Sequence, residues 1–160
     1  MRKIDISDLL GMWFHDVNIS RIAIDYVKKQ VELEFSIPVG FWNSPNRFGI
    51  TDGEVKGTLV LTGLLYLVID PPDNGPCNLD YEGIEITYDG SATTESSTEK
   101  SLVDIAGLPR DLPEEAFIHW FWVNDWNSNI YVAAMGLHFE IERYSLGPMW
   151  RGPYTSVPPV

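Results

Sequence analysis

Histidine, cysteine and serine are common catalytic and metal-binding residues, but none of them falls in a recognised motif in this sequence. The three histidines, His15, His119 and His138, are not spaced as in an HExxH helix or a zinc finger. Cys77 is the single cysteine, which excludes an internal disulfide and a multi-cysteine zinc site. The sequence contains no GxSxG nucleophile motif and no phosphate-binding glycine loop. We therefore predict a chain that is not an enzyme, with no catalytic residue, no metal site and no cofactor.

Two of the histidines have informative neighbours. His119 lies among Phe117, Trp120 and Phe121, and this apolar setting favours a hydrogen-bonded core histidine over a metal ligand. His15 is followed by Asp16 in an aromatic context just before the first expected strand. We expect hydrogen bonds from this pair to orient the chain there, and ligand binding by His15 and Asp16 is the alternative.

The acidic residues are unevenly distributed. The chain of 160 residues has 23 acidic and 11 basic residues, a net charge of −12, and the segment from Asp70 to Glu115 alone has 12 acidic and two basic residues. Such a field repels nucleic acids and anionic membranes and favours a basic protein partner, although an acidic surface can also serve solubility alone. In the strand expected over 79–89, Glu85 and Asp89 alternate with apolar residues, so we predict a partner-binding face at Glu82, Glu85 and Asp89.

Tryptophans provide a second hypothesis for binding. Of the six, Trp42 and Trp126 fall in expected loops, where an exposed indole ring can stack on a sugar. Trp120 and Trp122 share one face of an expected strand and are predicted to be core residues. The alternative function is thus a carbohydrate-binding or small-ligand-binding β module that uses Trp42 and Trp126.

The element that organises the chain is an expected hairpin with strands at 117–123 and 130–135, joined by 124–129. Odd and even positions of its first strand are both apolar, which is typical of a strand in the middle of a sheet, covered on both faces. The linker is rich in Asn and Asp, which tolerate left-handed backbone conformations and hydrogen-bond their own backbone.

The other expected strands are short and separated by turn residues. Residues 31–39 alternate strictly, 54–69 reads as one long strand buried on both faces, and further strands are expected at 18–25, 79–89, 102–106 and 137–141. A helical turn at 6–10 is the only helix expected. We predict a mainly β, single-domain antiparallel β-sandwich or barrel of about seven or eight strands. The β domain should span 1–146, followed by a Pro-rich tail at 147–160.

Two short motifs carry a resemblance. The run Trp13-Phe14-His15-Asp16 before amphipathic strands, and Asn124-Asp125-Trp126-Asn127-Ser128 in the late hairpin, resemble small bacterial proteins grouped with the immunity proteins of polymorphic toxin systems. The resemblance implies a non-catalytic, acidic β domain that neutralises a basic toxin by binding it. Because the N-terminus lacks an apolar signal core and the longest apolar stretch, 59–69, is too short to span a bilayer, we expect a cytoplasmic location without membrane association.

Overall fold

The computed structural model describes residues 4–10, 14, 16–39, 53–70, 84–92 and 112–142. Within these residues the chain is mainly β, with one short helix, as the alternation of apolar residues predicts. The elements are α1 (Ile6–Leu10), β1 (Val17–Asp25), β2 (Gln30–Val39), β3 (Gly53–Thr62), β4 (Tyr66–Ile69), β5 (Ile84–Ala92), β6 (Phe117–Val123), a 3-10 turn η2 (Asn124–Trp126), β7 (Ser128–Ala134) and β8 (Gly136–Ile141). Most of the loop expected at 40–53, the strand at 102–106 and the tail at 147–160 lie outside the described residues, and Gly53 is the first residue of β3.

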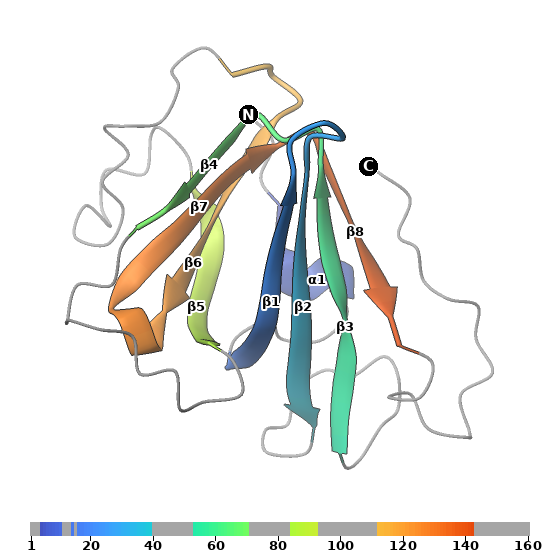
Figure 1. The fold of residues 1–160 in the computed structure, drawn as a ribbon, viewed down its shortest axis with the longest axis vertical. Coiled ribbons are helices and arrows are strands. Elements are labelled where there is room, and N and C mark those ends of the chain that lie inside the picture. The colour runs from blue at the N-terminus through green and yellow to red at the C-terminus, as the bar shows by residue number, and fades with distance from the viewer. Residues whose placement is uncertain are drawn as a thin grey trace.

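The strands of the described residues form one eight-stranded antiparallel sheet in the order β4-β7-β6-β5-β1-β2-β3-β8. The predicted hairpin is confirmed as β6 and β7, which pair from Phe117 with Ala134 to Val123 with Ser128. Both of its strands lie inside the sheet, and their side chains are buried on both faces. The strands converge near the β1–β2 turn and spread apart toward the opposite end of the molecule (Figure 1).

The two strands at the ends of this order, β4 and β8, are each continuous in the chain with a strand near the other end. β3 continues into β4 through Gly63, Leu64 and Leu65, and β7 continues into β8 through Met135 alone. Across the corner the Met135 N–H donates to the Thr62 carbonyl at 3.1 Å, and the Leu65 N–H donates to the Ala133 carbonyl at 2.9 Å. The sheet therefore curls back on itself, which makes the fold barrel-like.

The prediction of one long strand over 54–69 is wrong at this corner. Gly63 has a φ of +61°, a left-handed conformation that glycine adopts readily, and it bends the chain between β3 and β4. A Cβ at this position would lie 2.8 Å from the Met135 Cβ. The bend lets β3 pair with β2 and β8, whereas β4 pairs with β7.

The inner face of the curled sheet carries the main hydrophobic core. Side chains from the sheet and from α1 pack there, including Ile6 and Leu10 of the helix. Phe14 lies at the centre, with its ring centroid 5.4 Å from that of Phe35 and 6.1 Å from that of Phe139. The helix is thus held against the inner surface of the sheet (Figure 1).

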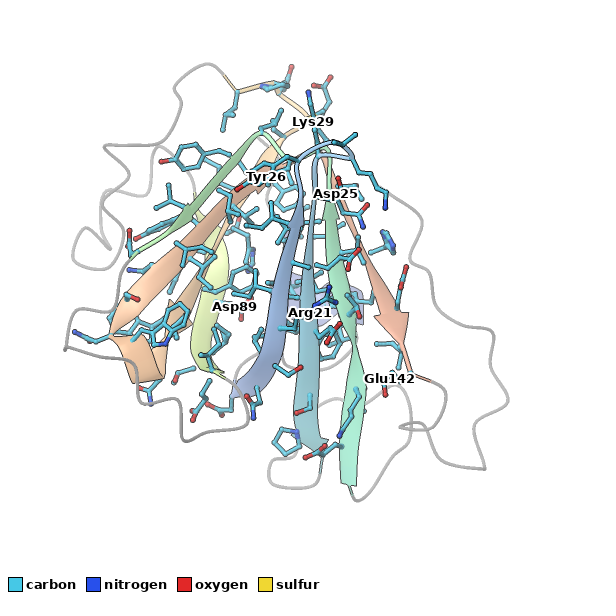
Figure 2. All side chains as sticks on the ribbon, viewed as in Figure 1. Arg21, Asp25, Tyr26, Lys29, Asp89 and Glu142 are labelled. Atoms are coloured by element: carbon cyan, nitrogen blue, oxygen red, sulfur yellow. The ribbon has the colours of Figure 1, made fainter. Side chains whose placement is uncertain are left out.

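The outer face of the sheet has an apolar part and a polar part. Over β4, β6 and β7 it bears a second apolar cluster formed by Ile118, Trp120, Tyr131 and Ala133. Over β1, β2, β3 and β8 it bears polar residues such as Arg21 (Figure 2), which forms an ion pair with Glu34. The alternation predicted for 31–39 is confirmed in β2, where the odd positions from 31 to 37 are buried and the even positions are more exposed.

Candidate functional site

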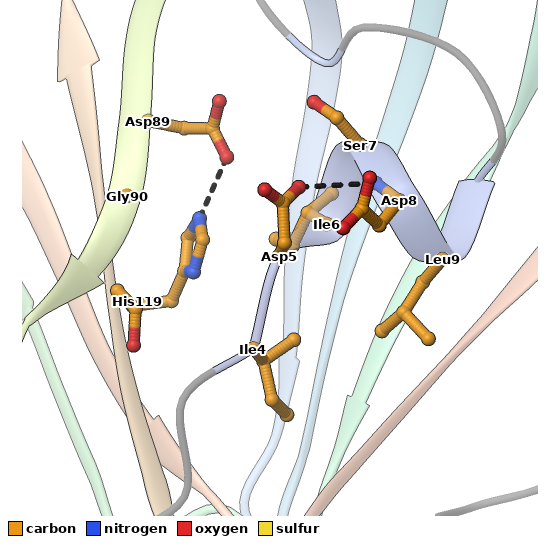
Figure 3. A pocket seen from close by; sticks show the side chains of 10 residues that line it. Ile4, Asp5, Ile6, Ser7, Asp8, Leu9, Asp89, Gly90 and His119 are labelled. Atoms are coloured by element: carbon orange, nitrogen blue, oxygen red, sulfur yellow. Dashed lines mark hydrogen bonds and ion pairs between the residues drawn. The ribbon is translucent and has the colours of Figure 1, made fainter.

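A pocket of about 650 Å³ lies between the N-terminal segment and strands β5 and β6 (Figure 3). One wall is the region of α1, and the other is formed by β5 and β6. The residues that line it are Ile4, Asp5, Ile6, Ser7, Asp8, Leu9, Asp89, Gly90, Ser91 and His119. It therefore combines three carboxylates, one imidazole and two hydroxyls with an apolar surface.

Asp89 reaches this pocket because β5 contains an irregularity. Ile86 pairs with Val123 of β6, but the next paired residue, Tyr88, pairs with Trp122, so the register shifts between them. A bulge of this kind exchanges the two faces of a strand. Before it Ile86 faces the core, and after it Asp89 and Ser91 lie opposite the inward-facing Phe121 and His119.

His119 and Asp89 form a buried pair. The Nε2 atom of His119 lies 2.8 Å from Oδ2 of Asp89, and the two side chains are 1% and 11% exposed. With an ionised carboxylate this contact requires a proton on Nε2, which then donates to Asp89. The other ring nitrogen, Nδ1, is buried and has no hydrogen-bond partner among the described residues. The ring packs at 5.0 Å from Phe121, centroid to centroid, which fixes its orientation.

The opposite wall is held by hydrogen bonds at the start of α1. The Asp5 carboxylate accepts the Asp8 N–H at 3.0 Å, an N-terminal capping contact, and the Asp5 carbonyl accepts the Leu9 N–H at 3.2 Å. Ser7 Oγ accepts the Phe14 N–H at 2.8 Å and ties the helix to the segment that follows it. Because Ile6 and Leu10 are buried in the core, the acidic end of the helix is kept on the pocket side.

The predicted partner-binding residues do not share one face. Glu85 is exposed, and it precedes the irregularity in β5, whereas Asp89 follows it and lines the pocket. The expectation of a common polar face over 85–89 is wrong because the register shift separates the two carboxylates. Glu82 lies outside the described residues.

The predicted ligand-binding residues are also dispersed. Trp126, in η2, is partly buried and packs against the main core. Asp16 is described, with a left-handed φ of +55°, and does not line the pocket. Trp42 and His15 lie outside the described residues.

The two described histidines lie apart. His119 is on the inner face of β6, whereas His138 on β8 pairs across from Val60 and lies 3.4 Å from the exposed Glu140. In the part of the chain that the structure describes, no group of three His, Cys, Asp or Glu side chains is arranged to hold a metal ion. The prediction of a hydrogen-bonded core histidine is confirmed for His119, since its ring is buried and bonded to Asp89.

Comparison with known proteins gives no relative from which a role could be transferred. The chain matches no protein-family model, and neither the curated proteins nor the solved structures contain a significant match. Among the described residues there is also no helix with the length and apolar character needed to cross a membrane. The function therefore has to be argued from the pocket itself.

Proposed function

We propose that the chain is a non-catalytic binding domain that recognises a basic protein through the pocket between α1 and β5–β6. The observation that supports this most is the convergence of Asp5, Asp8 and Asp89 from distant parts of the sequence on one pocket. Carboxylates held in one concave site concentrate a negative potential, which attracts a cationic partner and speeds its association. The net charge of −12 acts in the same direction.

An immunity-type role would explain this arrangement. An inhibitor of a basic nuclease has to present carboxylates where the enzyme binds phosphates, and it needs no reaction of its own. The resemblance of the Trp13–Asp16 and Asn124–Ser128 motifs to immunity proteins of polymorphic toxin systems is consistent with that role. The partner would then be a small basic toxin domain encoded by a neighbouring gene.

The test is the association rate with the purified basic domain encoded beside this gene. The rate should fall as the Debye length shrinks from about 30 Å at 0.01 M salt to about 8 Å at 0.15 M, while dissociation changes less. The double variant Asp5→Asn and Asp8→Asn should associate more slowly than a control in which Glu140 and Glu142, exposed at the end of β8, are changed to Gln. Equal rates for the two variants, or no binding at low salt, would remove the support for this function.

The non-catalytic part of the proposal has a separate test. Hydrolase, transferase and oxidoreductase substrate panels should give no turnover with the purified chain. Reproducible turnover that is lost in His119→Ala or His15→Ala would contradict it, and loss in His119→Ala would indicate that the Asp89–His119 pair acts as a general base.

A second candidate function is the binding of a small molecule such as a carbohydrate. The volume of the pocket, about 650 Å³, lies inside the range of about 300–1,000 Å³ that is usual for small-ligand sites. A glycan array tests this candidate. Specific binding that is lost in Trp126→Ala or Trp42→Ala while the fold stays intact would favour stacking on these tryptophans, whereas loss only in Asp89→Asn would place the sugar in the pocket.

A further inference from the structure

The polar side chains around the pocket mainly accept hydrogen bonds. When ionised, the carboxylates of Asp5, Asp8 and Asp89 can only accept hydrogen bonds. The described lining contains no lysine or arginine. The two serine hydroxyls can donate or accept, and Ser7 Oγ already accepts the Phe14 N–H. A ligand that fits this surface has to supply donors.

His119 adds a further hydrogen-bond acceptor, which is buried in the protein interior. When Nε2 donates to Asp89, Nδ1 retains its lone pair and is an acceptor. Leaving such a buried acceptor unpaired costs free energy, because it loses its hydrogen bonds to water without gaining others. Nδ1 has no partner among the described residues and belongs to a side chain that is 1% exposed, so it is a polar group that a ligand could satisfy.

Ser91 lies beside that histidine on the pocket wall. It stands directly opposite His119 in the register of β5 and β6, and its Oγ is also buried without a described partner. Directly opposed Cβ atoms lie about 4.5–5.5 Å apart, so the side chains of Ser91 and His119 are neighbours. The pocket wall thus contains two neighbouring buried polar atoms, Nδ1 of His119 and Oγ of Ser91, that the described residues leave without hydrogen bonds.

We infer that the pocket binds a cation rich in N–H donors, a guanidinium or primary ammonium group, carried on a short apolar stem. The charged group would lie between the carboxylates of Asp5 and Asp89, with one N–H directed toward His119 Nδ1, and the stem would lie along Ile4 and Leu9. Planar guanidinium groups bind carboxylates through paired hydrogen bonds, which favours them over ammonium. This inference rests on the proposed binding function and names the group that the site takes.

The experiment titrates the full chain with n-butylguanidinium and, as a control of matched shape without charge, N-butylurea. Binding is followed by the backbone amide NMR signals of Gly90 and Ser91 and by the side-chain ¹⁵N signals of His119. Butylguanidinium should shift these signals in a saturable manner, with an affinity at least about tenfold higher than that of the urea. The Nδ1 signal should move most, because it gains a hydrogen bond.

Variants locate the binding group. Asp5→Asn should weaken butylguanidinium binding several-fold while the helix stays capped, because asparagine caps helices as well as aspartate. Asp89→Asn should weaken it further, and Glu85→Gln, with the same loss of charge outside the pocket, should leave it unchanged. If the urea binds as tightly as the guanidinium, if the shifts fall away from Gly90 and Ser91, or if Glu85→Gln has the same effect as Asp5→Asn, the inference is wrong.

A third titration identifies the source of the cation. A blocked Gly-Ser-Arg-Ser-Gly peptide that binds more tightly than butylguanidinium would indicate an arginine of a protein partner. Weaker binding of the peptide would indicate a free small cation. These titrations need no protein partner, so the absence of a basic partner would overturn the proposed function while leaving the cation site established.

Discussion

Removal of the Asp89 carboxylate should destabilise the fold measurably. In Asp89→Ala the Nε2–H of His119 loses its acceptor at 2.8 Å inside a site where the two side chains are 1% and 11% exposed. A hydrogen bond to a charged group contributes about 1.5–3 kcal/mol, and a buried donor without a partner costs about 1–3 kcal/mol. Loss of the carboxylate also removes its repulsion from Asp5 and Asp8 across the pocket. We therefore expect a net loss of about 2 kcal/mol in the free energy of unfolding at pH 7.

Urea unfolding followed by far-UV circular dichroism measures this loss. With a denaturant dependence of about 1–3 kcal/mol/M, a change of about 2 kcal/mol moves the midpoint by about 1 M. Glu85→Ala is the matched control, because this carboxylate is exposed on the same strand and its removal should change stability by less than about 0.5 kcal/mol.

A double-mutant cycle tests whether the loss of stability comes from the contact between Asp89 and His119. His119→Phe keeps an aromatic ring beside Phe121 but leaves Asp89 without its imidazole partner. The double variant should lose less stability than the sum of the single variants, by about 1–3 kcal/mol. Additive losses, or an Asp89→Ala effect no larger than that of Glu85→Ala, would show that the contact does not stabilise the fold and would refute this reasoning.

Three further outcomes are expected. Gly90→Ala should lower stability by about 1–3 kcal/mol and alter tryptophan fluorescence, because the added Cβ would lie 2.9 Å from the Trp120 Nε1 atom. Gly63→Ala should lower the free energy of unfolding by about 1–2 kcal/mol, measured by thermal unfolding, because the φ of +61° at this position disfavours a residue with a side chain. The Lys28 backbone N–H, which donates to the carboxylate, holds the pKa of Asp25 below its ordinary value of 3.8. The contribution of the ionised Asp25 carboxylate to the stability of the fold is therefore complete above pH 3.8 and is lost as the pH falls through the lower pKa of the folded state. A ¹³C carboxyl titration of Asp25 with a midpoint at or above 3.8 would contradict this.

The strands with one polar face could be predicted from the sequence because their alternation is local. Val31 to Ile37 alternates with polar residues, and the structure buries the apolar set. The β6–β7 hairpin could be predicted because both of its strands are apolar on both faces and the linker favours a left-handed residue, which the structure places at Asn127 with a φ of +47°.

The pocket could not be predicted, because its geometry depends on irregularities that alternation does not encode. The sequence of β5 continues to alternate through Thr87, so nothing in it marks the register shift that turns Asp89 inward. The pairing of Asp89 with His119 follows from that shift and from the partner strand. The wall at Asp5 depends on α1 docking inside the curled sheet, a long-range contact that no local pattern indicates.

The sheet cannot close until β8, its last strand in the sequence, has been synthesised. β3 leaves the ribosome well before β8, the strand that covers its open edge, and both halves of the corner at Gly63 and Met135 must be present before the sheet can curl back on itself. Until then β3 exposes a row of unpaired backbone groups, a state that favours pairing with other chains. We therefore expect nascent chains truncated before β8 to aggregate or to require a chaperone, and full-length chains to fold slowly, because their closing contacts are distant in sequence.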